Sequence, residues 1–161
     1  MAKVYLSLGS NMGDRAANIA RALEELRKRG VRTTRTSSLY ETEPVEFREQ
    51  EWFLNFVAEA ETELQPAELI AVAMEVERSM GRERRVAKGP RVIDIDVLLY
   101  GDAVVDTLEL EVPHPRMAGR RFVLAPLAEI APDVMHPILK KTAVELLAET
   151  TDHSEVRRLR P

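Results

Sequence analysis

Two aspartates separated by one residue, Asp94 and Asp96, are the side chains of this sequence best suited to chemistry. They interrupt the otherwise apolar run 92–100, which predicts a β-strand. Side chains two apart on a strand point to the same face, so the two carboxylates share one face. The apolar residues are expected to line the other face: Ile93, Ile95, Val97 and Leu99. Carboxylates held this close repel each other, and Mg²⁺ relieves the repulsion while leaving positions for water and phosphate.

A basic stretch comes just before the aspartates. Residues 78–91 contain six basic residues and one acid, whereas the chain as a whole has a formal net charge of −4. A charge run is usually a solvated loop, and an Asp-x-Asp pair alone more often makes ordinary salt bridges. Together they favour phosphoryl chemistry, because guanidinium groups bind phosphate oxygens bidentately while metal ions hold the others. The candidate phosphate ligands are Arg82, Arg84 and Arg91.

Residues 112–122 supply further candidate phosphate ligands: His114, Arg116, Arg120 and Arg121. Taken alone, His114 between two prolines is typical of a structural turn histidine. Phe53 and Asn55 share a face of another expected strand, and a flat heterocycle could stack on Phe53 and Phe122 while the Asn55 amide binds its ring edge. Plain core packing explains these aromatic residues about equally well.

The elements that must position these residues follow a βαββαβ order. Strands are expected at 4–8, 31–40, 53–63 and 92–100, with one helix from Asp14 to Gly30 and another from Pro66 to Gly81. This α+β order predicts a ferredoxin-like antiparallel sheet with two helices on one face. A hairpin arm at 103–105 and short helices at 122–130 and 142–149 extend it. If these helices cover the other face, the result is a three-layer α/β/α sandwich.

Composition narrows the class of protein. The 161 residues are enough for a single domain with its own core, expected to span 1–161. The absence of cysteine excludes disulfides and thiolate metal sites, and the acidic balance argues against general nucleic-acid binding. No apolar run is long enough for a membrane span and no secretory signal is seen, so a cytoplasmic protein is expected. We also expect a monomer.

Along nearly its full length the chain resembles the 6-hydroxymethyl-dihydropterin pyrophosphokinase family. The matching segments are YLSLGSNMGDR, SSLYETEP, FLNFVAEAET, GPRVIDIDVLLYG, VPHPRM and RRFVLAPLAEIAP. The resemblance implies transfer of pyrophosphate from ATP to 6-hydroxymethyl-7,8-dihydropterin, which gives AMP and the pterin diphosphate in folate biosynthesis.

The resemblance also implies roles for individual residues. Asp94 and Asp96 would bind two Mg²⁺ ions that bridge the ATP phosphates and the pterin hydroxymethyl oxygen, with Arg82 and Arg91 contacting the phosphates. The implied ATP site is completed by Glu77, Arg84, His114 and Arg120. The implied pterin pocket consists of Thr42, Val45, Phe53, Asn55 and Phe122, next to Asp94.

Three positions depart from better-known members of the family. Lys88 stands where some carry a tryptophan, Glu109 replaces an arginine, and Pro115 replaces an aromatic residue near the nucleotide. These changes concern ATP affinity and loop closure and leave the aspartate pair intact.

Two other functions remain open. Another Mg²⁺-dependent nucleotide transferase on the same fold would keep both aspartates but would not act on a pterin, and the identity of its products would reveal it. A regulatory ligand-binding module of ferredoxin-like fold would show no turnover and no Mg²⁺ requirement. RNA binding is less favoured, because the expected sheet lacks interleaved exposed aromatic residues.

Overall fold

A computed structural model describes residues 1–43, 51–81 and 92–159. Along the chain the elements are β1 (Ala2–Ser10), α1 (Arg15–Lys28), β2 (Val31–Thr36), β3 (Tyr40–Thr42), β4 (Phe53–Thr62), α2 (Pro66–Ser79), β5 (Asp94–Tyr100), β6 (Val105–Asp106), β7 (Glu111–Val112), the 3-10 turn η1 (Met117–Gly119), α3 (Arg121–Ile130), α4 (Ala143–Glu149) and β8 (Val156–Arg158). The fold is therefore mixed α and β, with four α-helices in the described part of the chain.

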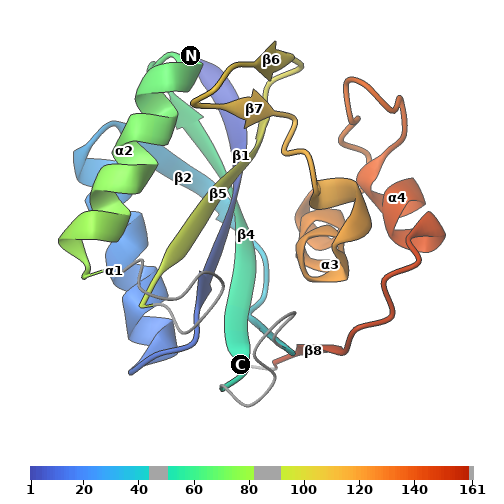
Figure 1. Ribbon diagram of the computed structural model, residues 1–161, viewed down its shortest axis with the longest axis horizontal. Coiled ribbons are helices and arrows are strands. Elements are labelled where there is room, and N and C mark those ends of the chain that lie inside the picture. Colours follow the sequence, from blue (N-terminus) through green and yellow to red (C-terminus); the bar gives the residue numbers. More distant parts are fainter. Residues whose placement is uncertain (44–50, 82–91, 160–161) are drawn as a thin grey trace.

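The main sheet has the strand order β5-β1-β4-β3-β8, and β2 pairs with β4 beside β3. Every pairing in it is antiparallel. Helices α1 and α2 lie on one side of the sheet, and α3 and α4 lie on the other (Figure 1). The sequence prediction of an antiparallel sheet is confirmed. Of the C-terminal helices, α3 lies over the second face of the sheet and α4 packs against α3.

Each face of the sheet has its own apolar core, because side chains alternate along a strand. The larger core joins the sheet to α1 and α2, and the predicted stripe of β4 lies in it: Leu54, Phe56, Ala58 and Ala60. The smaller core joins the sheet to α3 and includes Tyr5 and Val57. Asn55, Asp94 and Asp96 alternate with residues of the larger core along their strands. These three side chains therefore share a face of the sheet with the smaller core.

Both long helices begin where the sequence predicts. The Asp14 side chain accepts a hydrogen bond from the Ala17 amide at 3.1 Å, which is N-cap geometry. Gly30 ends the turn after α1 with φ of 94°, a left-handed conformation that glycine adopts at little cost. In α2, Pro66 occupies the first turn, and Gln65 and Glu68 form a capping box.

Three details of the strand prediction are wrong. The expected strand 31–40 is split into β2 and β3. The Ser37 Oγ accepts a hydrogen bond from the Val57 amide at 3.0 Å, and this side-chain bond interrupts the backbone ladder. The hairpin arm consists of β6 and β7 rather than residues 103–105. The short strand β8, which pairs with β3, was not predicted, since three residues of mixed polarity carry no clear alternation.

The predicted alternation also fails near the end of β5. Leu6 pairs with Val97 but Tyr5 pairs with Leu99, so Leu98 is an extra residue in a β-bulge. Ile93, Ile95 and Val97 lie in the larger core as expected, whereas Leu99 packs in the smaller core. The assignment of Leu99 to the Ile95 face is therefore wrong, and the bulge is the reason.

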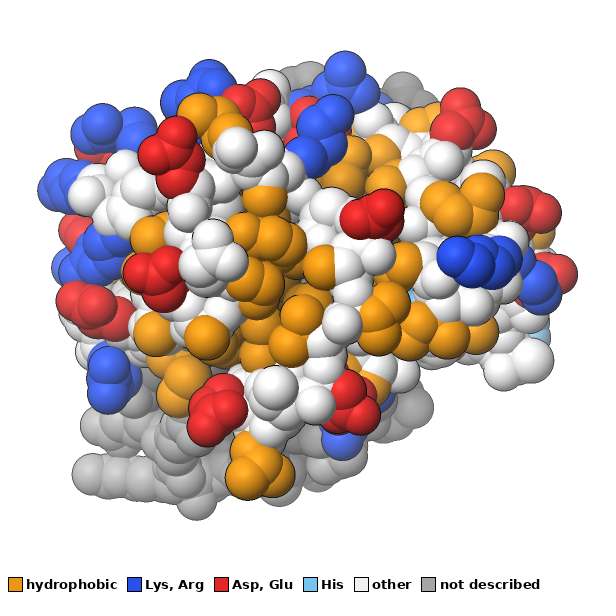
Figure 2. Space-filling view, turned by 90° about the horizontal axis from the view of Figure 1, so that it is seen from above, with side chains coloured by type: hydrophobic (Ala, Val, Ile, Leu, Met, Phe, Trp, Pro, Cys, Tyr) orange, Lys and Arg blue, Asp and Glu red, His pale blue; other side chains and the backbone are white. Residues whose placement is uncertain are grey.

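The surface of the molecule carries charges of both signs. In the face shown in Figure 2, hydrophobic side chains gather toward the middle, with Lys, Arg, Asp and Glu around them. Within the described ranges, no helix has the length and apolar character needed to cross a membrane.

Leu69 provides a test of the larger core. It is fully buried at the contact of α2 with the sheet. We expect Leu69→Ala to lower the free energy of unfolding by about 3 kcal/mol, the loss typical of a large-to-small change in a packed core. Leu108→Ala is the matched control, because Leu108 is fully exposed. Equal effects of the two substitutions in urea unfolding would contradict the assignment of the core.

Candidate functional site

The two aspartates occupy the start of β5 on the face expected from their spacing. Asp94 pairs with Gly9 of β1 and Asp96 pairs with Ser7. Both carboxylates are partly exposed, while Ile95 between them is buried in the larger core. They therefore lie on the same side of the sheet as α3.

Asn55 lies on the same face, two strands away. It pairs with Gly9 from the opposite side, so Asp94, Gly9 and Asn55 form one row across β5, β1 and β4. Directly opposed residues in antiparallel strands point to the same face, and two strand spacings correspond to about 10 Å. The structure thus brings the predicted metal ligand and the predicted pterin ligand onto one surface.

Thr42 fixes the amide of Asn55. The Asn55 Nδ2 donates a hydrogen bond to the Thr42 Oγ1 at 2.5 Å, and both side chains are buried. Phe53 pairs with Thr42, two positions along the ladder from Asn55 and on the same face. With one Nδ2 hydrogen committed to Thr42, the amide oxygen is left to accept a hydrogen bond from a ligand.

The second aromatic residue predicted for the pterin comes from α3. Phe122 lies in the first turn of that helix and packs against the smaller core. The Arg120 guanidinium carbon is 5.5 Å from the centroid of the Phe122 ring, a cation–π contact. Phe122, in the first turn of α3, and Arg120, its N-cap residue, therefore lie at the start of the helix that covers the face bearing Asn55 and Asp94.

His114 is held beside Asp96 by the backbone on two sides. Its amide donates to the Leu98 carbonyl at 2.9 Å, and its Nδ1 accepts from the Arg116 amide at 3.1 Å. The Nε2 lies 3.9 Å from the Asp96 Oδ1. Because Nδ1 is an acceptor, a neutral imidazole carries its hydrogen on Nε2, which faces the Asp96 carboxylate.

The surroundings of His114 favour the neutral imidazole. Burial lowers the pKa of His114 to about 4, with the positive charges of Arg120 and Arg116 adding to the effect and the negative charge of Asp94 opposing it. At neutral pH the side chain is therefore an uncharged hydrogen-bond donor.

Glu77 lies close to the aspartates but in the interior. It is in the last turn of α2, and its Oε2 accepts a hydrogen bond from the Ile95 amide at 2.8 Å. This bond ties α2 to β5 between the two aspartates. It gives Glu77 a positioning task that the sequence did not suggest, while its predicted contact with the nucleotide stays a prediction.

A cavity of about 260 Å³ opens beside Asp96. Its lining combines apolar and polar residues of α2, β5 and the segment around β6 and β7: Ile70, Asp96, Val97, Thr107, Leu108, Glu109, Leu110, Glu111, His114 and Pro115. Glu109 and Pro115 were noted from the sequence, whereas five other lining residues were missed: Ile70, Thr107, Leu108, Leu110 and Glu111. Only the position of these residues on neighbouring elements in three dimensions reveals them.

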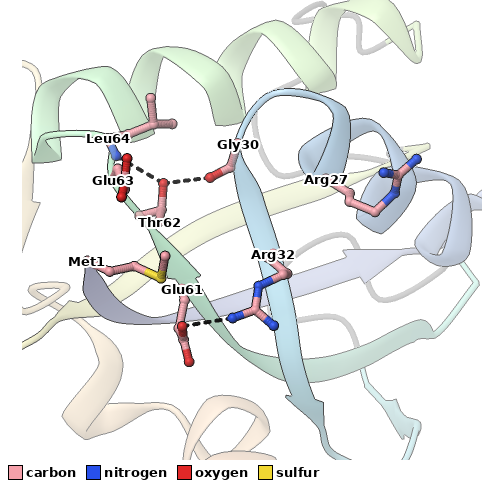
Figure 3. Close-up of a pocket in the computed structure, with 8 residues that line it drawn as sticks. All are labelled: Met1, Arg27, Gly30, Arg32, Glu61, Thr62, Glu63 and Leu64. Carbon is pink, nitrogen blue, oxygen red and sulfur yellow. Dashed lines mark hydrogen bonds and ion pairs between the residues drawn. The ribbon is translucent and has the colours of Figure 1, made fainter.

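A larger hollow, of about 440 Å³, lies at the other end of the sheet (Figure 3). It is lined by Thr62, which pairs with Ala2, seven residues along the ladder from Asn55 and Gly9. Its cations already have acidic partners, since Arg32 contacts Glu61 at 2.9 Å and Arg27 contacts Glu24. Despite its size, this hollow has no part in the candidate site.

Four predicted site residues lie outside the described residues: Arg82, Arg84, Arg91 and Val45. Lys88, one of the noted departures, lies outside them as well. The other predicted site residues all lie on, or next to, the face of the sheet that α3 covers, except Glu77, which supports β5 from the interior.

Asp94 and Asp96 are the two carboxylates predicted to bind Mg²⁺, and they lie on this face of the sheet. In residues 1–43, 51–81 and 92–159, no group of three or more His, Asp or Glu side chains is arranged to hold a metal ion. Mg²⁺ in phosphoryl-transfer sites commonly uses one or two carboxylates, with water and substrate phosphates as its other ligands. Asp94 and Asp96 fit a metal that arrives with a nucleotide, and they do not form a closed protein cage.

The fold and this surface define a small-molecule enzyme in which an antiparallel sheet carries paired carboxylates beside a buried amide. The chain belongs to the 7,8-dihydro-6-hydroxymethylpterin-pyrophosphokinase (HPPK) family, whose sequence model matches residues 5–132.

Curated relatives agree over nearly the whole chain. The 2-amino-4-hydroxy-6-hydroxymethyldihydropteridine pyrophosphokinase of Aquifex aeolicus is 46% identical over 151 residues, covering 94% of each chain. The enzyme of the same name from Methylorubrum extorquens is 45% identical and covers 99% of each. The folic acid synthesis protein fol1 of Schizosaccharomyces pombe is 42% identical over 89% of this chain, which spans only 20% of that longer protein.

Solved structures show the same fold at low sequence identity. The crystal structure of Plasmodium falciparum HPPK-DHPS wild type with pteroate matches with a TM-score of 0.71 at 16% identity, over 92% of this chain and 42% of that one. The wild-type structure with SDX-DHP gives a TM-score of 0.68 at 17% identity, over 92% and 43%. The chain thus spans less than half of these larger proteins.

The bond from Glu77 to β5 can be tested by stability. We expect Glu77→Ala to lower the free energy of unfolding by about 1–3 kcal/mol, because the buried Ile95 amide loses its acceptor. Glu75→Ala is the control on the same helix, since the Glu75 side chain is 57% exposed. Urea unfolding of both variants measures the difference in their free energies of unfolding. A Glu77 variant no less stable than the Glu75 variant would remove the positioning role.

Proposed function

We propose that residues 1–161 form a single pyrophosphokinase domain in which Asp94 and Asp96 hold two Mg²⁺ ions with ATP, and Asn55 and Thr42 hold the pterin. Pyrophosphoryl transfer from ATP is the reaction of the family to which the chain belongs, and it serves folate biosynthesis. The observation that supports the residue assignment is the row Asp94, Gly9 and Asn55. In this row Asp94 and Asn55 lie two strand spacings, about 10 Å, apart on one face of the sheet.

In the reaction, the hydroxymethyl oxygen of the pterin attacks the β-phosphorus of ATP and its proton is released to solvent. A new P–O bond forms, the bond between the β-phosphorus and the α,β-bridging oxygen breaks, and AMP leaves with that oxygen. When bound, Mg²⁺ supplies positive charge to the phosphate oxygens and to the attacking oxygen. Asp94 and Asp96 would hold these ions and so fix the position of their positive charge. Most of the catalytic effect is then positioning and charge stabilisation.

We assign the nucleotide to the cavity beside Asp96. Apolar residues of its lining, Ile70, Val97 and Leu110, provide contact area for a base. His114 is placed to donate its Nε2 hydrogen to a phosphate oxygen next to Asp96, and the Arg120 charge lies on the same side of the sheet. Arg82, Arg84 and Arg91 are proposed as further phosphate ligands on their sequence pattern alone, and Glu77 as part of the nucleotide region.

We assign the pterin to the space between β4 and α3. The Asn55 oxygen accepts from a ring N–H, and Phe53 and Phe122 supply flat apolar surface. Val45 completes the pocket on the basis of sequence. The buried amide supports selectivity, because a ligand without a matching donor would leave the amide oxygen without a partner.

The proposal extends to the setting of the reaction. The strand order β5-β1-β4-β2, with α1 and α2 on one face, supports a ferredoxin-like core. We further propose that the protein acts as a cytoplasmic monomer on small-molecule substrates, with no role for nucleic acid or membrane.

The function is tested by mixing the protein with ATP, Mg²⁺ and 6-hydroxymethyl-7,8-dihydropterin and analysing the products. AMP and a pterin diphosphate are expected, and omission of Mg²⁺ should abolish both. ADP with a pterin monophosphate would show transfer of a single phosphoryl group and contradict the proposal. Absence of any pterin product would leave the other nucleotide transferase open. Binding without turnover would indicate a ligand-binding module.

The metal assignment predicts a loss of activity without a loss of fold. Asp94→Asn and Asp96→Asn should each lower kcat/KM by about 10³-fold or more, a loss comparable to removing a major electrostatic contact of a transition state. Far-UV circular dichroism should remain unchanged. Asp102→Asn is the control, since Asp102 is exposed in the turn after β5. Near-normal activity of either site variant at ordinary Mg²⁺ concentration would end the assignment.

The pterin assignment predicts a selective effect of Asn55→Ala. Affinity for the pterin should fall by about tenfold or more, in line with the loss of a buried hydrogen bond, while affinity for an ATP analogue with Mg²⁺ stays within about twofold. Calorimetry with each ligand separately measures this. Equal losses for both ligands would mean that Asn55 acts only on the structure.

A further inference from the structure

Gly9 lies at the centre of the site but has no side chain to contribute. Its neighbours across the sheet are Asn55 on β4 and Asp94 on β5. It therefore separates the proposed pterin ligand from the proposed metal ligand on the central strand of the row.

The space above the Gly9 Cα is already occupied. A Cβ built on Gly9 would lie 2.2 Å from the Asn55 Oδ1, 3.3 Å from the Asn55 Cγ and 3.5 Å from the Phe53 Cδ1. Carbon and oxygen in van der Waals contact need well over 3 Å, so any residue other than glycine would push the amide away.

Backbone conformation does not explain the glycine. Gly13, Gly30, Gly81 and Gly101 have positive φ, where a side chain is strained, but Gly9 is not among them and lies in a regular strand. Glycine inside a strand usually weakens it, and it often marks close approach of another group. At Gly9 that group is the Asn55 amide.

The amide has little freedom to move aside. Asn55 is 6% exposed and its Nδ2 is bonded to the Thr42 Oγ1, a side chain that is 2% exposed. Moving the oxygen off Gly9 would require a rotation that breaks this bond or displaces Phe53. The position of the Asn55 oxygen thus depends on the missing Cβ at Gly9.

We propose that Gly9 is a positioning residue for the pterin: by leaving its Cα bare, it lets the Asn55 oxygen lie over β1 and accept from the pterin ring. The inference rests on the proposed function for the identity of the ligand. An added Cβ turns the amide away and removes that acceptor, whereas the metal side is unaffected, because the backbone pairing of Gly9 with Asp94 does not involve a side chain.

The test is a double-mutant cycle on the full-length protein with 6-hydroxymethyl-7,8-dihydropterin as the probe, in the presence of Mg²⁺ and a non-hydrolysable ATP analogue. Gly9→Ala should raise the Kd for the pterin about tenfold or more, as expected for the loss of one buried hydrogen bond. The Kd for the ATP analogue should change less than twofold. Gly119→Ala is the control, since a Cβ at Gly119 meets no atom within 4 Å.

The second arm places Gly9→Ala in the Asn55→Ala background, where the clashing amide is gone. There it should cause no further loss of pterin affinity, and it should cost less thermal stability than Gly9→Ala does in the wild type. This arm remains informative if Gly9→Ala alone fails to fold, since the double variant is then expected to fold.

Two results would overturn the inference. One is a Gly9→Ala protein with wild-type pterin affinity, and the other is a loss that simply adds to that of Asn55→Ala. Failure of the proposed function would appear differently, as a wild-type protein that forms no AMP and binds no pterin. The coupling in stability between Gly9 and Asn55 would still be measured in that case, and additive stability losses would overturn the packing on which the inference depends.

Discussion

The register of β1 against its two neighbours is the constraint on which the described site depends. β1 pairs with β4 through Gly9 and Asn55, and with β5 through Gly9 and Asp94. A slip of one residue in either ladder would turn a whole strand over, placing apolar side chains on the site and polar ones in the core. The large apolar core between the sheet and α1 and α2 therefore stabilises the geometry of residues that it does not contact. Packing of apolar side chains on one face of the sheet thus fixes the positions of the site residues on the other face.

The elements that carry strong patterns could be predicted from the sequence. The period-2 alternation of Val4, Leu6 and Leu8 and the capping residues Asp14 and Pro66 each indicate one local structure, and the structure has them there. The pairing of the two aspartates on one face also follows from spacing alone. Local pattern is sufficient where a residue's neighbours in sequence decide its environment.

Other features depend on contacts between distant residues, and local pattern does not contain them. The bulge at Leu98 arises from how β5 fits β1, and the split between β2 and β3 arises from a Ser37 hydrogen bond to β4. The resemblance implied only a place near the nucleotide for Glu77, whereas the structure shows that its carboxylate accepts a hydrogen bond from the Ile95 amide, 18 positions away. The close approach of Asn55 to Gly9 was equally hidden, since a glycine after an apolar run usually only signals the end of a strand.

The placement of the acids on β5 has a consequence for self-association. β5 lies at one end of the strand order of the described sheet, and a strand in that position offers backbone groups to which another copy can add. The Glu77 carboxylate accepts a hydrogen bond from the Ile95 amide, and Asp94 and Asp96 place negative charge on the same strand. Edge strands that carry charge resist pairing with a second sheet. The acidic residues that we propose for the chemistry on β5 thus also disfavour pairing of this strand with another sheet. Apolar replacements of Asp94 and Asp96 would remove that charge and leave the hydrogen bond from the Ile95 amide to Glu77 in place.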